Sequence, residues 1–200
     1  KECWLLIFVL LVIDLIFIKN LNINFYILIF IYFVFSNLYT LHLKKIIIID
    51  IITLGMLYSF RVIGGGLVLD ISLSIWLISF SFFFFFSMAS LKRLMEIIDR
   101  SKNINFQIPG RGYLKKDQYF ISTISSSTGM LSVLILILYI NSDDVQNLYS
   151  NSNILWGVCI VLVYWISRIN ILTTRHQIKI DPIFFALKDK ISYLCLLTII

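Results

Sequence analysis

Long runs of apolar residues, separated by short polar stretches, dominate the pattern of this chain. A helix that crosses a membrane needs about 20 mostly apolar residues, because each residue rises 1.5 Å along a hydrocarbon core about 30 Å thick. The pattern predicts such spans near residues 3–18, 25–41, 46–69, 72–91, 118–140, 154–172 and from 191 onward. The predicted fold class is therefore all-α, a polytopic transmembrane helical bundle with about seven spans.

Some of these runs have a composition that favours strands in water, such as the β-branched segment IIIIDII and the aromatic segment SFFFFFS. In lipid, however, every backbone polar group needs a partner, which leaves only helices and closed barrels. Barrel strands are about ten residues long and alternate in polarity. The apolar runs here are longer and do not alternate, so we expect helices.

The composition agrees with this interpretation. Hydrophobic residues make up 60% of the 200 residues and charged residues 14%, against roughly 25% charged residues in a soluble domain. The cysteines Cys3, Cys159 and Cys195 each lie in an apolar stretch and lack metal-ligand spacing. We interpret them as small hydrophobic residues rather than as a disulfide or metal site.

Basic residues gather in alternate loops. If the loops are assigned to two faces by parity, one face receives Lys19 alone, together with the acidic residues Asp70, Asp143 and Asp144. The other face receives Lys1, Lys44, Lys45, Lys92, Arg93, Arg100, Lys102, Arg111, Lys115, Lys116, Arg175, Lys179, Lys188 and Lys190. By the positive-inside rule the basic face is cytoplasmic. This asymmetry explains the net charge of +6 without a nucleic-acid partner.

The domain organisation follows from the spans. We expect residues 1–200 to form a single transmembrane domain, with residues 92–117 as a cytoplasmic loop or cap. The chain starts with Lys1 and stops within an apolar run. We therefore expect the domain to continue beyond both ends.

Ionisable residues within the predicted spans are candidate site residues, because they are costly in lipid and usually face a cavity. Asp50 and Arg61 lie eleven residues apart on one span, which places them on nearly the same helical face. A glycine triplet, Gly64–Gly66, follows Arg61. Two interpretations stay open: a packing patch with a snorkelling arginine, or a cavity that binds an anion.

The longest basic loop contains further candidates. If the preceding helix continues past the membrane, Lys92, Arg93 and Glu96 lie on neighbouring turns. They would then form a basic shelf suited to a polyanion such as diphosphate. Arg111 lies between two glycines, whose flexible backbone also offers donors to an anion. A plain solvated loop explains the charges equally well, and the same alternative applies to Lys44 at the end of an earlier span.

Several of these segments, in this order, resemble the UbiA superfamily of membrane prenyltransferases, over residues 24–197. The segments are YTLHLKKIIIIDIITLGMLYSFRVIGGG, SLKRLME, GRGY, LYINS, YWISR and DPIFFALKD. From GRGY onward they are similar to a bacterial branch whose membrane domain is often fused behind a phosphatase-like domain. SLKRLME also resembles the branch that makes polyprenyl-phosphoryl ribose, a lipid precursor for cell-wall sugars.

The resemblance implies a bundle of about nine helices around an apolar cavity that holds a lipid tail, with a Mg²⁺–diphosphate site under a cytoplasmic cap. The implied enzyme is a transferase in the bacterial plasma membrane. It moves a prenyl or phosphoribosyl group between a diphosphate donor and an acceptor, one of them a polyprenyl lipid. Mg²⁺ suits this chemistry because it prefers carboxylate and phosphate oxygens and makes diphosphate a better leaving group.

Roles for individual residues follow from the resemblance. The expected phosphate ligands are the cations Lys44, Lys92, Arg93 and Arg111. Arg61 is expected to line the cavity. Glu96 or Asp50 is expected to coordinate Mg²⁺ or to orient the substrate, as the catalytic carboxylate.

The chain departs from the family pattern at both Asp-rich motifs. The first motif, of the type N-D-x-x-D-x-x-x-D, belongs on a helix that we expect before Lys1. In place of the second, DxxxD, stand Lys92, Arg93, Glu96 and Asp99. This change resembles the phosphoribosyl branch more than the branch with aromatic substrates, and it argues against a metal mechanism with two Asp clusters. We therefore expect residues 1–200 alone to be inactive.

A second class of function is compatible with the same charged positions. A transporter or non-catalytic membrane scaffold would use Asp50, Arg61 and Arg168 as a gated path without Mg²⁺. Transporters often contain two repeats with interrupted spans in matching places. The chain has one glycine-rich interruption and no internal repeat, so the transferase is the leading hypothesis.

Overall fold

The computed structural model describes residues 22–71, 73–100, 110–142, 145, 154–178 and 181–199. This part of the chain is helical and contains no strand. Within it, five helices are long and apolar enough to cross a membrane: α2 (Ile23–Leu41), α3 (Ile49–Val68), α4 (Ile75–Arg100), α5 (Gln118–Ile140) and α7 (Leu155–Thr174). The shorter elements are η1 (Leu43–Lys45), η2 (Lys115–Asp117), α8 (Pro182–Ala186) and α9 (Lys190–Ile199).

The prediction of an all-α bundle is confirmed, and four predicted spans match α2, α3, α5 and α7 closely. The helix expected at 72–91 instead begins at Ile75 and continues to Arg100, so part of the predicted cytoplasmic loop is helical. The span expected at 3–18 lies outside the described residues, and α9, Lys190–Ile199, covers nine residues of the last predicted span. The count of seven spans therefore stays a prediction.

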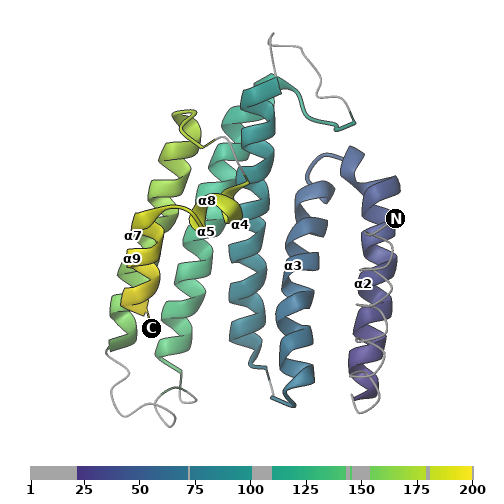
Figure 1. Ribbon diagram of the computed structural model, residues 1–200, viewed down its shortest axis with the longest axis vertical. Helices are drawn as coiled ribbons and strands as arrows, with labels where there is room; N and C mark the ends of the chain where they lie inside the picture. The colour runs from purple at the N-terminus through teal and green to yellow at the C-terminus, as the bar shows by residue number, and fades with distance from the viewer. Residues whose placement is uncertain are drawn as a thin grey trace, which may run out of the picture.

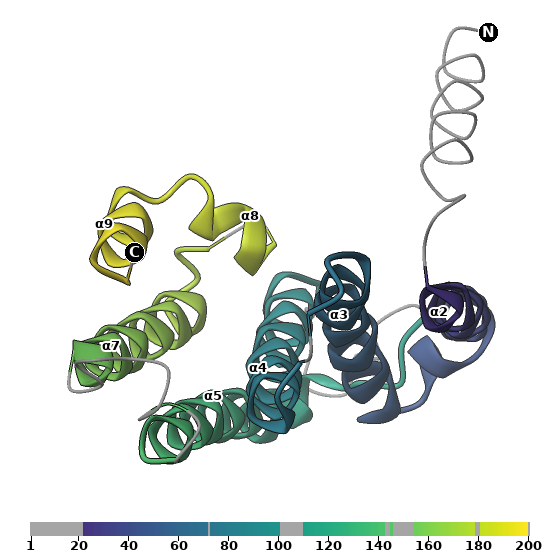
Figure 2. The same cartoon turned by 90° about the horizontal axis from the view of Figure 1, so that it is seen from below.

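The long helices form a curved row in which sequence neighbours pack side by side (Figures 1 and 2). The order is α2, α3, α4, α5, α7 and α9, and α8 turns back from the α7 side to contact α4. The connections from α2 to α3 (residues 42–48) and from α3 to α4 (residues 69–74) are short, which makes antiparallel packing of these neighbours the natural arrangement.

The outer surface of this row is apolar, as expected for contact with lipid. Helix α2 has no buried residue, and Phe30 and Phe33 on it are 68% and 65% exposed. Exposed leucine, isoleucine and valine side chains continue over the other long helices. A soluble protein rarely exposes so much contiguous apolar surface, so the chain is an integral membrane protein.

Small residues bring the central helices together. Ser87 of α4 donates a hydrogen bond to the Ser125 carbonyl of α5 at 2.7 Å. A Cβ atom added at Gly129 would lie 2.6 Å from Ile166 Cγ2 of α7. Close approach through small side chains is typical of helix packing in membranes.

The two ends of the bundle differ in charge. At one end lie η1, η2 and the C-terminal ends of α4 and α7 (Figure 1), with the basic residues Lys44, Lys45, Lys115, Lys116 and Arg175. At the other end, the turn between α3 and α4 contains Asp70. The predicted gathering of basic loops at one end is therefore present among the described residues. Its assignment to the cytoplasm stays a prediction.

Candidate functional site

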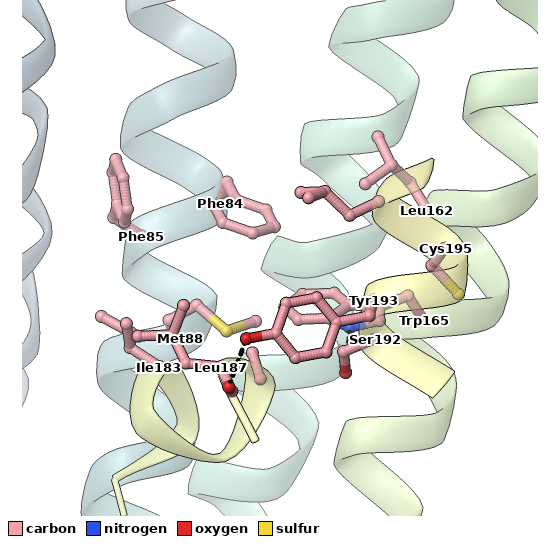
Figure 3. Close-up of a pocket in the computed structure, with 12 residues that line it drawn as sticks. Phe84, Phe85, Met88, Leu162, Trp165, Ile183, Leu187, Ser192, Tyr193 and Cys195 are labelled. Carbon is pink, nitrogen blue, oxygen red and sulfur yellow. Dashed lines mark hydrogen bonds between the residues drawn. The ribbon is translucent and has the colours of Figure 1, made fainter. Parts of the chain in front are cut away.

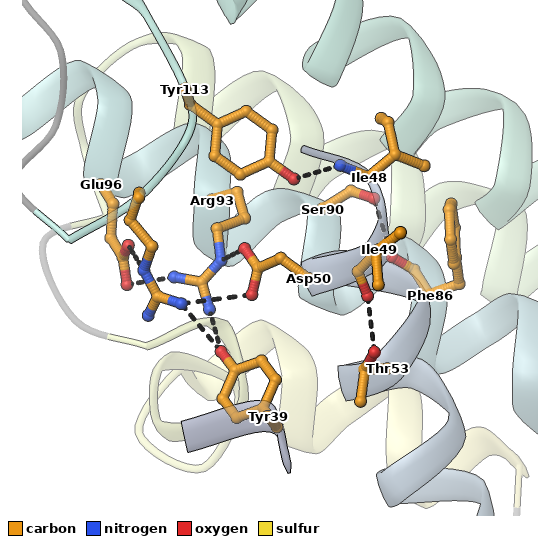
Figure 4. A network of polar contacts seen from close by, with 11 residues as sticks. Tyr39, Ile48, Ile49, Asp50, Thr53, Phe86, Ser90, Arg93, Glu96 and Tyr113 are labelled. Atoms are coloured by element: carbon orange, nitrogen blue, oxygen red, sulfur yellow. Dashed lines mark hydrogen bonds and ion pairs between the residues drawn. The ribbon is translucent and has the colours of Figure 1, made fainter. Parts of the chain in front are cut away.

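Charged side chains and one tyrosine, from four segments, meet near the basic end of the bundle. They are Tyr39 of α2, Asp50 of α3, and Arg93 and Glu96 of α4 (Figure 4), together with Arg111 from the segment before η2. We call these five residues the polar centre. Three helices and an irregular segment place them together, although they are up to 72 residues apart in the sequence.

Arg93 is the inner cation of the polar centre. Its side chain is 1% exposed, and its Nε lies 2.5 Å from Oδ2 of Asp50, whose side chain is fully buried. Its Nη1 lies 2.5 Å from Oε1 of Glu96, one turn further along α4. Its Nη2 donates a hydrogen bond to the Tyr39 hydroxyl at 2.9 Å. Arg93 thus links three helices through one guanidinium group.

Arg111 is the outer cation. Its Nη1 donates to Tyr39 Oη at 3.0 Å and to Asp50 Oδ1 at 3.2 Å, and its Nε lies 3.5 Å from Oε2 of Glu96. The side chains of Arg111 and Glu96 are 18% and 22% exposed. A ligand approaching from the basic end therefore meets Arg111 and Glu96 before it meets Arg93 or Asp50.

The polar centre is balanced in charge, with two arginines and two carboxylates. Buried charges of this kind are stable only when each has partners, since desolvation costs several kcal/mol per ion. The inner pair, Asp50 and Arg93, is closed to solvent, so these two side chains are suited to hold the other members of the polar centre in position. The outer pair, Arg111 and Glu96, is partly exposed. The guanidinium of Arg111 can donate two parallel hydrogen bonds to the oxygens of a phosphate.

The segment that delivers Arg111 is fixed by its neighbours. Tyr113 is fully buried, and its hydroxyl accepts a hydrogen bond of 2.9 Å from the Ile48 N–H at the start of α3. Burial raises the pKa of Tyr113 to about 12. Gly112 lies so close to the connection between α2 and α3 that an added Cβ would be 2.6 Å from the Lys45 carbonyl oxygen. The GRGY motif thus anchors Arg111 against Asp50.

Four of the seven predicted site residues therefore meet: Asp50, Arg93, Glu96 and Arg111. Lys44 lies half-buried in η1, outside the five-residue polar centre. Lys92 points to another segment, and its Nζ lies 2.6 Å from Oδ2 of Asp181.

Arg61 also lies apart from the polar centre, eleven residues and about 16 Å further along α3 than Asp50. Its Nη2 donates to the Tyr32 hydroxyl at 3.0 Å, and its guanidinium lies 5.1 Å from the centre of the Tyr58 ring. It borders a groove of about 410 Å³ between α2 and α3, beside Gly64 and Gly65. This groove is separate from the polar centre, so the expected place of Arg61 in a substrate cavity stays a prediction.

Residues 181–189, which we call the strap, form a second feature that sequence reasoning only partly identified. Asp181 caps α8 by accepting a hydrogen bond from the Ile183 N–H at 3.1 Å. Asp189 accepts two hydrogen bonds from Arg168 of α7, at 2.6 and 3.0 Å, and this contact holds the pKa of Asp189 below its usual range. The motif DPIFFALKD was recognisable in the sequence, but the partners of its two aspartates were not.

The strap lines one side of an apolar pocket of about 310 Å³ (Figure 3). Helix α4 contributes Phe84 and Met88, and Trp165 of α7 stacks on Phe84 with ring centres 5.8 Å apart. Helix α9 and the strap supply the remaining walls. The pocket offers almost only carbon surface to a ligand.

Tyr39 and Tyr113 are the site residues that sequence reasoning missed. Both lie within quoted motifs, YTLHLKK and GRGY, yet a tyrosine near a membrane surface is usually an interfacial anchor. Nothing in the sequence distinguishes that role from a hydroxyl between two arginines. Only the packing of α2 against the other segments reveals it.

The described residues do not fit a Mg²⁺ ion by themselves. Among them, no group of three His, Cys, Asp or Glu side chains lies close enough to hold a metal. Both oxygens of Asp50 already face arginines, as do those of Glu96. The predicted cofactor would therefore need further ligands, such as substrate phosphates or carboxylates outside the described residues.

Two curated relatives match most of this chain. An uncharacterized protein, y4nM, from Sinorhizobium fredii is 32% identical over 164 residues, which are 82% of this chain and 32% of that protein. Nodulation protein NoeC from Azorhizobium caulinodans is 28% identical over 166 residues, 83% of this chain and 54% of that protein. The chain thus spans about a third and about half of these relatives. No protein-family model and no solved structure matches the chain.

Proposed function

We propose that this chain forms part of a membrane transferase of the UbiA type. The enzyme moves a prenyl or phosphoribosyl group between a diphosphate donor and an acceptor, and one of the two is a polyprenyl lipid. The proposal rests on the sequence resemblance together with one structural observation. That observation is the polar centre, a balanced and largely buried set of arginines and carboxylates at the basic end of an apolar bundle.

The polar centre supports binding of a phosphorylated donor for a physical reason. Taking ionisable groups out of water is costly, so a buried cluster of them is a candidate site of function. Arginine pairs with phosphate in a two-pronged geometry that lysine does not offer. An incoming phosphate would share the Arg111 guanidinium with Asp50 and Glu96, while the buried Asp50–Arg93 pair keeps that guanidinium in place.

The structure supports the proposed roles of individual residues to different degrees, according to how exposed each side chain is and where it lies. Arg111 and Glu96 are the accessible members and are the best candidates for substrate contact. Arg93 and Asp50 are better placed to position them. Direct phosphate contacts by Lys44, Lys92 and Arg61 stay predictions from the resemblance.

The apolar pocket under the strap supports the lipid half of the proposal. Its carbon-rich walls suit a hydrocarbon chain, which gains about 25 cal/mol for each Å² of apolar surface removed from water. Lys92 links the two features, because it contacts the strap and lies four residues before Glu96 on α4. A lipid in the pocket could therefore carry its phosphate end toward the polar centre.

Magnesium stays the cofactor that the resemblance predicts. When bound, it would neutralise the diphosphate and assist its departure. Because the oxygens of Asp50 and Glu96 face arginines, we derive no step through it.

The test is transfer by the full-length protein in lipid nanodiscs, with Mg²⁺ and two substrate pairs. One pair is phosphoribosyl diphosphate with polyprenyl phosphate, and the other is a prenyl diphosphate with a small aromatic acceptor. We expect Arg111→Gln to lower kcat/KM about 10- to 100-fold, the range for losing a charge-assisted hydrogen bond. Lys116→Gln, which removes an exposed charge outside the polar centre, should leave it unchanged.

The pair that turns over identifies the transferred group. If neither pair reacts, or if Arg111→Gln retains full activity, the transferase proposal fails. Movement of a phosphorylated lipid across a proteoliposome membrane without covalent change would instead favour the transporter.

A further inference from the structure

The strap is tied to the bundle at both ends by carboxylate–cation pairs. At its N-terminal end, Asp181 pairs with Lys92 of α4 at 2.6 Å. At its C-terminal end, Asp189 pairs with both terminal nitrogens of Arg168 of α7. Between these ends, Ile183, Ala186 and Leu187 form one wall of the apolar pocket.

The two ties differ in strength. The Lys92–Asp181 pair has one short contact, and its side chains are 35% and 21% exposed. The Arg168–Asp189 pair is two-pronged and less exposed, at 16% and 14%. Asp189 also accepts hydrogen bonds from the backbone and side chain of Ser192, at 2.9 and 2.8 Å. Exposed single pairs contribute little to stability, so the Asp181 end is the weaker one.

The segment between the ties has little stability of its own. Helix α8 is five residues long, far below the length at which a helix is stable in isolation. Its place at the pocket therefore depends on the end contacts, on the apolar side chains beside it, and on one hydrogen bond near its C-terminal end, which the Tyr193 hydroxyl of α9 donates to the Leu187 carbonyl at 2.7 Å. Such weakly held segments open locally while the rest of a fold stays intact.

We propose that the strap is a movable cover of the apolar pocket. It swings about the Asp189 end and opens at the Asp181 end to admit one hydrocarbon chain, whose identity as a polyprenyl lipid rests on the proposed function. The opening end is the one nearest the polar centre, because Lys92 and Glu96 lie four residues apart on α4 and share a face. A chain that enters there leaves its phosphorylated end beside Arg111.

Native cysteines provide a test that needs no turnover. Cys195 lines the pocket and is 6% exposed, whereas Cys159 is 3% exposed in a separate cluster between α5 and α7. The full-length protein in phosphatidylcholine nanodiscs is treated with N-ethylmaleimide. The alkylation rate of each cysteine is then followed by peptide mass spectrometry, with Cys159 as the internal reference for general unfolding.

We expect Lys92→Gln and Asp181→Asn each to speed alkylation of Cys195 about 2- to 5-fold, the range for losing a partly exposed ion pair. Asparagine caps a helix as well as aspartate does, so Asp181→Asn removes the ion pair but keeps the start of α8. In the combined variant Lys92→Gln/Asp189→Asn, the alkylation rate of Cys195 should be higher than in either single variant. Cys159 should be unaffected, and Lys116→Gln should change neither rate.

The proposal that the strap moves would be refuted if the alkylation rate of Cys195 were unchanged in both single variants. It would also be refuted if alkylation of Cys195 and of Cys159 were accelerated equally. Polyprenyl phosphate added before the reagent should slow Cys195 in the wild-type protein. A lack of protection would refute the hydrocarbon ligand while leaving the movement of the strap supported. Neither result depends on catalysis, so failure here is distinguishable from failure of the transferase assay.

Discussion

At the scale of single residues, each charged side chain of the polar centre pairs with at least one side chain of opposite charge. Removing one of them therefore leaves a partner unpaired. Asp50 is fully buried, and Arg93 is nearly so. Removing one partner of such a pair leaves an uncompensated charge, which is far more costly than removing both. This asymmetry makes the inner pair testable separately from any catalytic role.

We predict that Asp50→Leu and Arg93→Leu each lower the free energy of unfolding by about 3–5 kcal/mol. The double variant should lose less than either single variant, because Glu96 and Arg111 then remain as one balanced pair. Chemical unfolding in detergent, followed by circular dichroism, measures the three values. Additive losses would show that the two side chains do not stabilise each other.

At the scale of elements, the GRGY segment acts through backbone proximity rather than through flexibility alone. Gly110 has a φ of +76°, which favours glycine, but an added Cβ there would meet open space. Gly112 instead packs on the connection between η1 and α3, where Ile48 also adopts a positive φ of 67°. The two connections therefore lock together and set the position of Arg111.

We predict that Gly112→Ala destabilises the protein by about 1–3 kcal/mol, because the new methyl group overlaps the Lys45 carbonyl oxygen and Ile47. The matched control is Gly157→Ala in α7, where an added Cβ has no neighbour within 4 Å. This control should be neutral or stabilising, since alanine favours helix over glycine. Equal thermal midpoints for the two variants would contradict the close approach at Gly112.

At the scale of the whole molecule, the separation of charge between the two ends of the bundle implies an orientation. Positively charged loops resist transfer across the membrane and stay in the cytoplasm. The polar centre and the opening end of the strap lie toward the same basic end. A phosphorylated donor would therefore reach them from the cytoplasm.

We predict opposite labelling of two exposed positions by a membrane-impermeant maleimide in intact bacterial cells. In a variant without native cysteines, Asp70→Cys in the turn between α3 and α4 should react. Lys116→Cys in η2 should react only after the cells are opened. Labelling of Lys116→Cys in intact cells would reverse the orientation and move the proposed donor site to the outside.

The sequence was sufficient for the features that depend on composition and local pattern. Apolar run length specifies a membrane helix because lipid imposes one thickness and requires internal hydrogen bonds. For this reason α2, α3, α5 and α7 were predictable within a few residues. The end of α4 was not, since a helix that leaves the membrane no longer needs apolar residues.

The ion-pair and hydrogen-bond partners of the site residues could not be predicted from the sequence, because they depend on which helix ends meet. Asp50 and Arg61 share nearly one face of α3, and the sequence pattern made both of them candidate site residues. Packing instead placed Arg93 and Arg111 against Asp50 and left Arg61 beside two tyrosines of α2 and α3. Lys92, adjacent to Arg93, turned to the strap, since successive helical residues point about 100° apart. The spacing of residues along a helix specifies the direction in which each side chain points. Which partner the side chain meets there depends on the neighbouring helices.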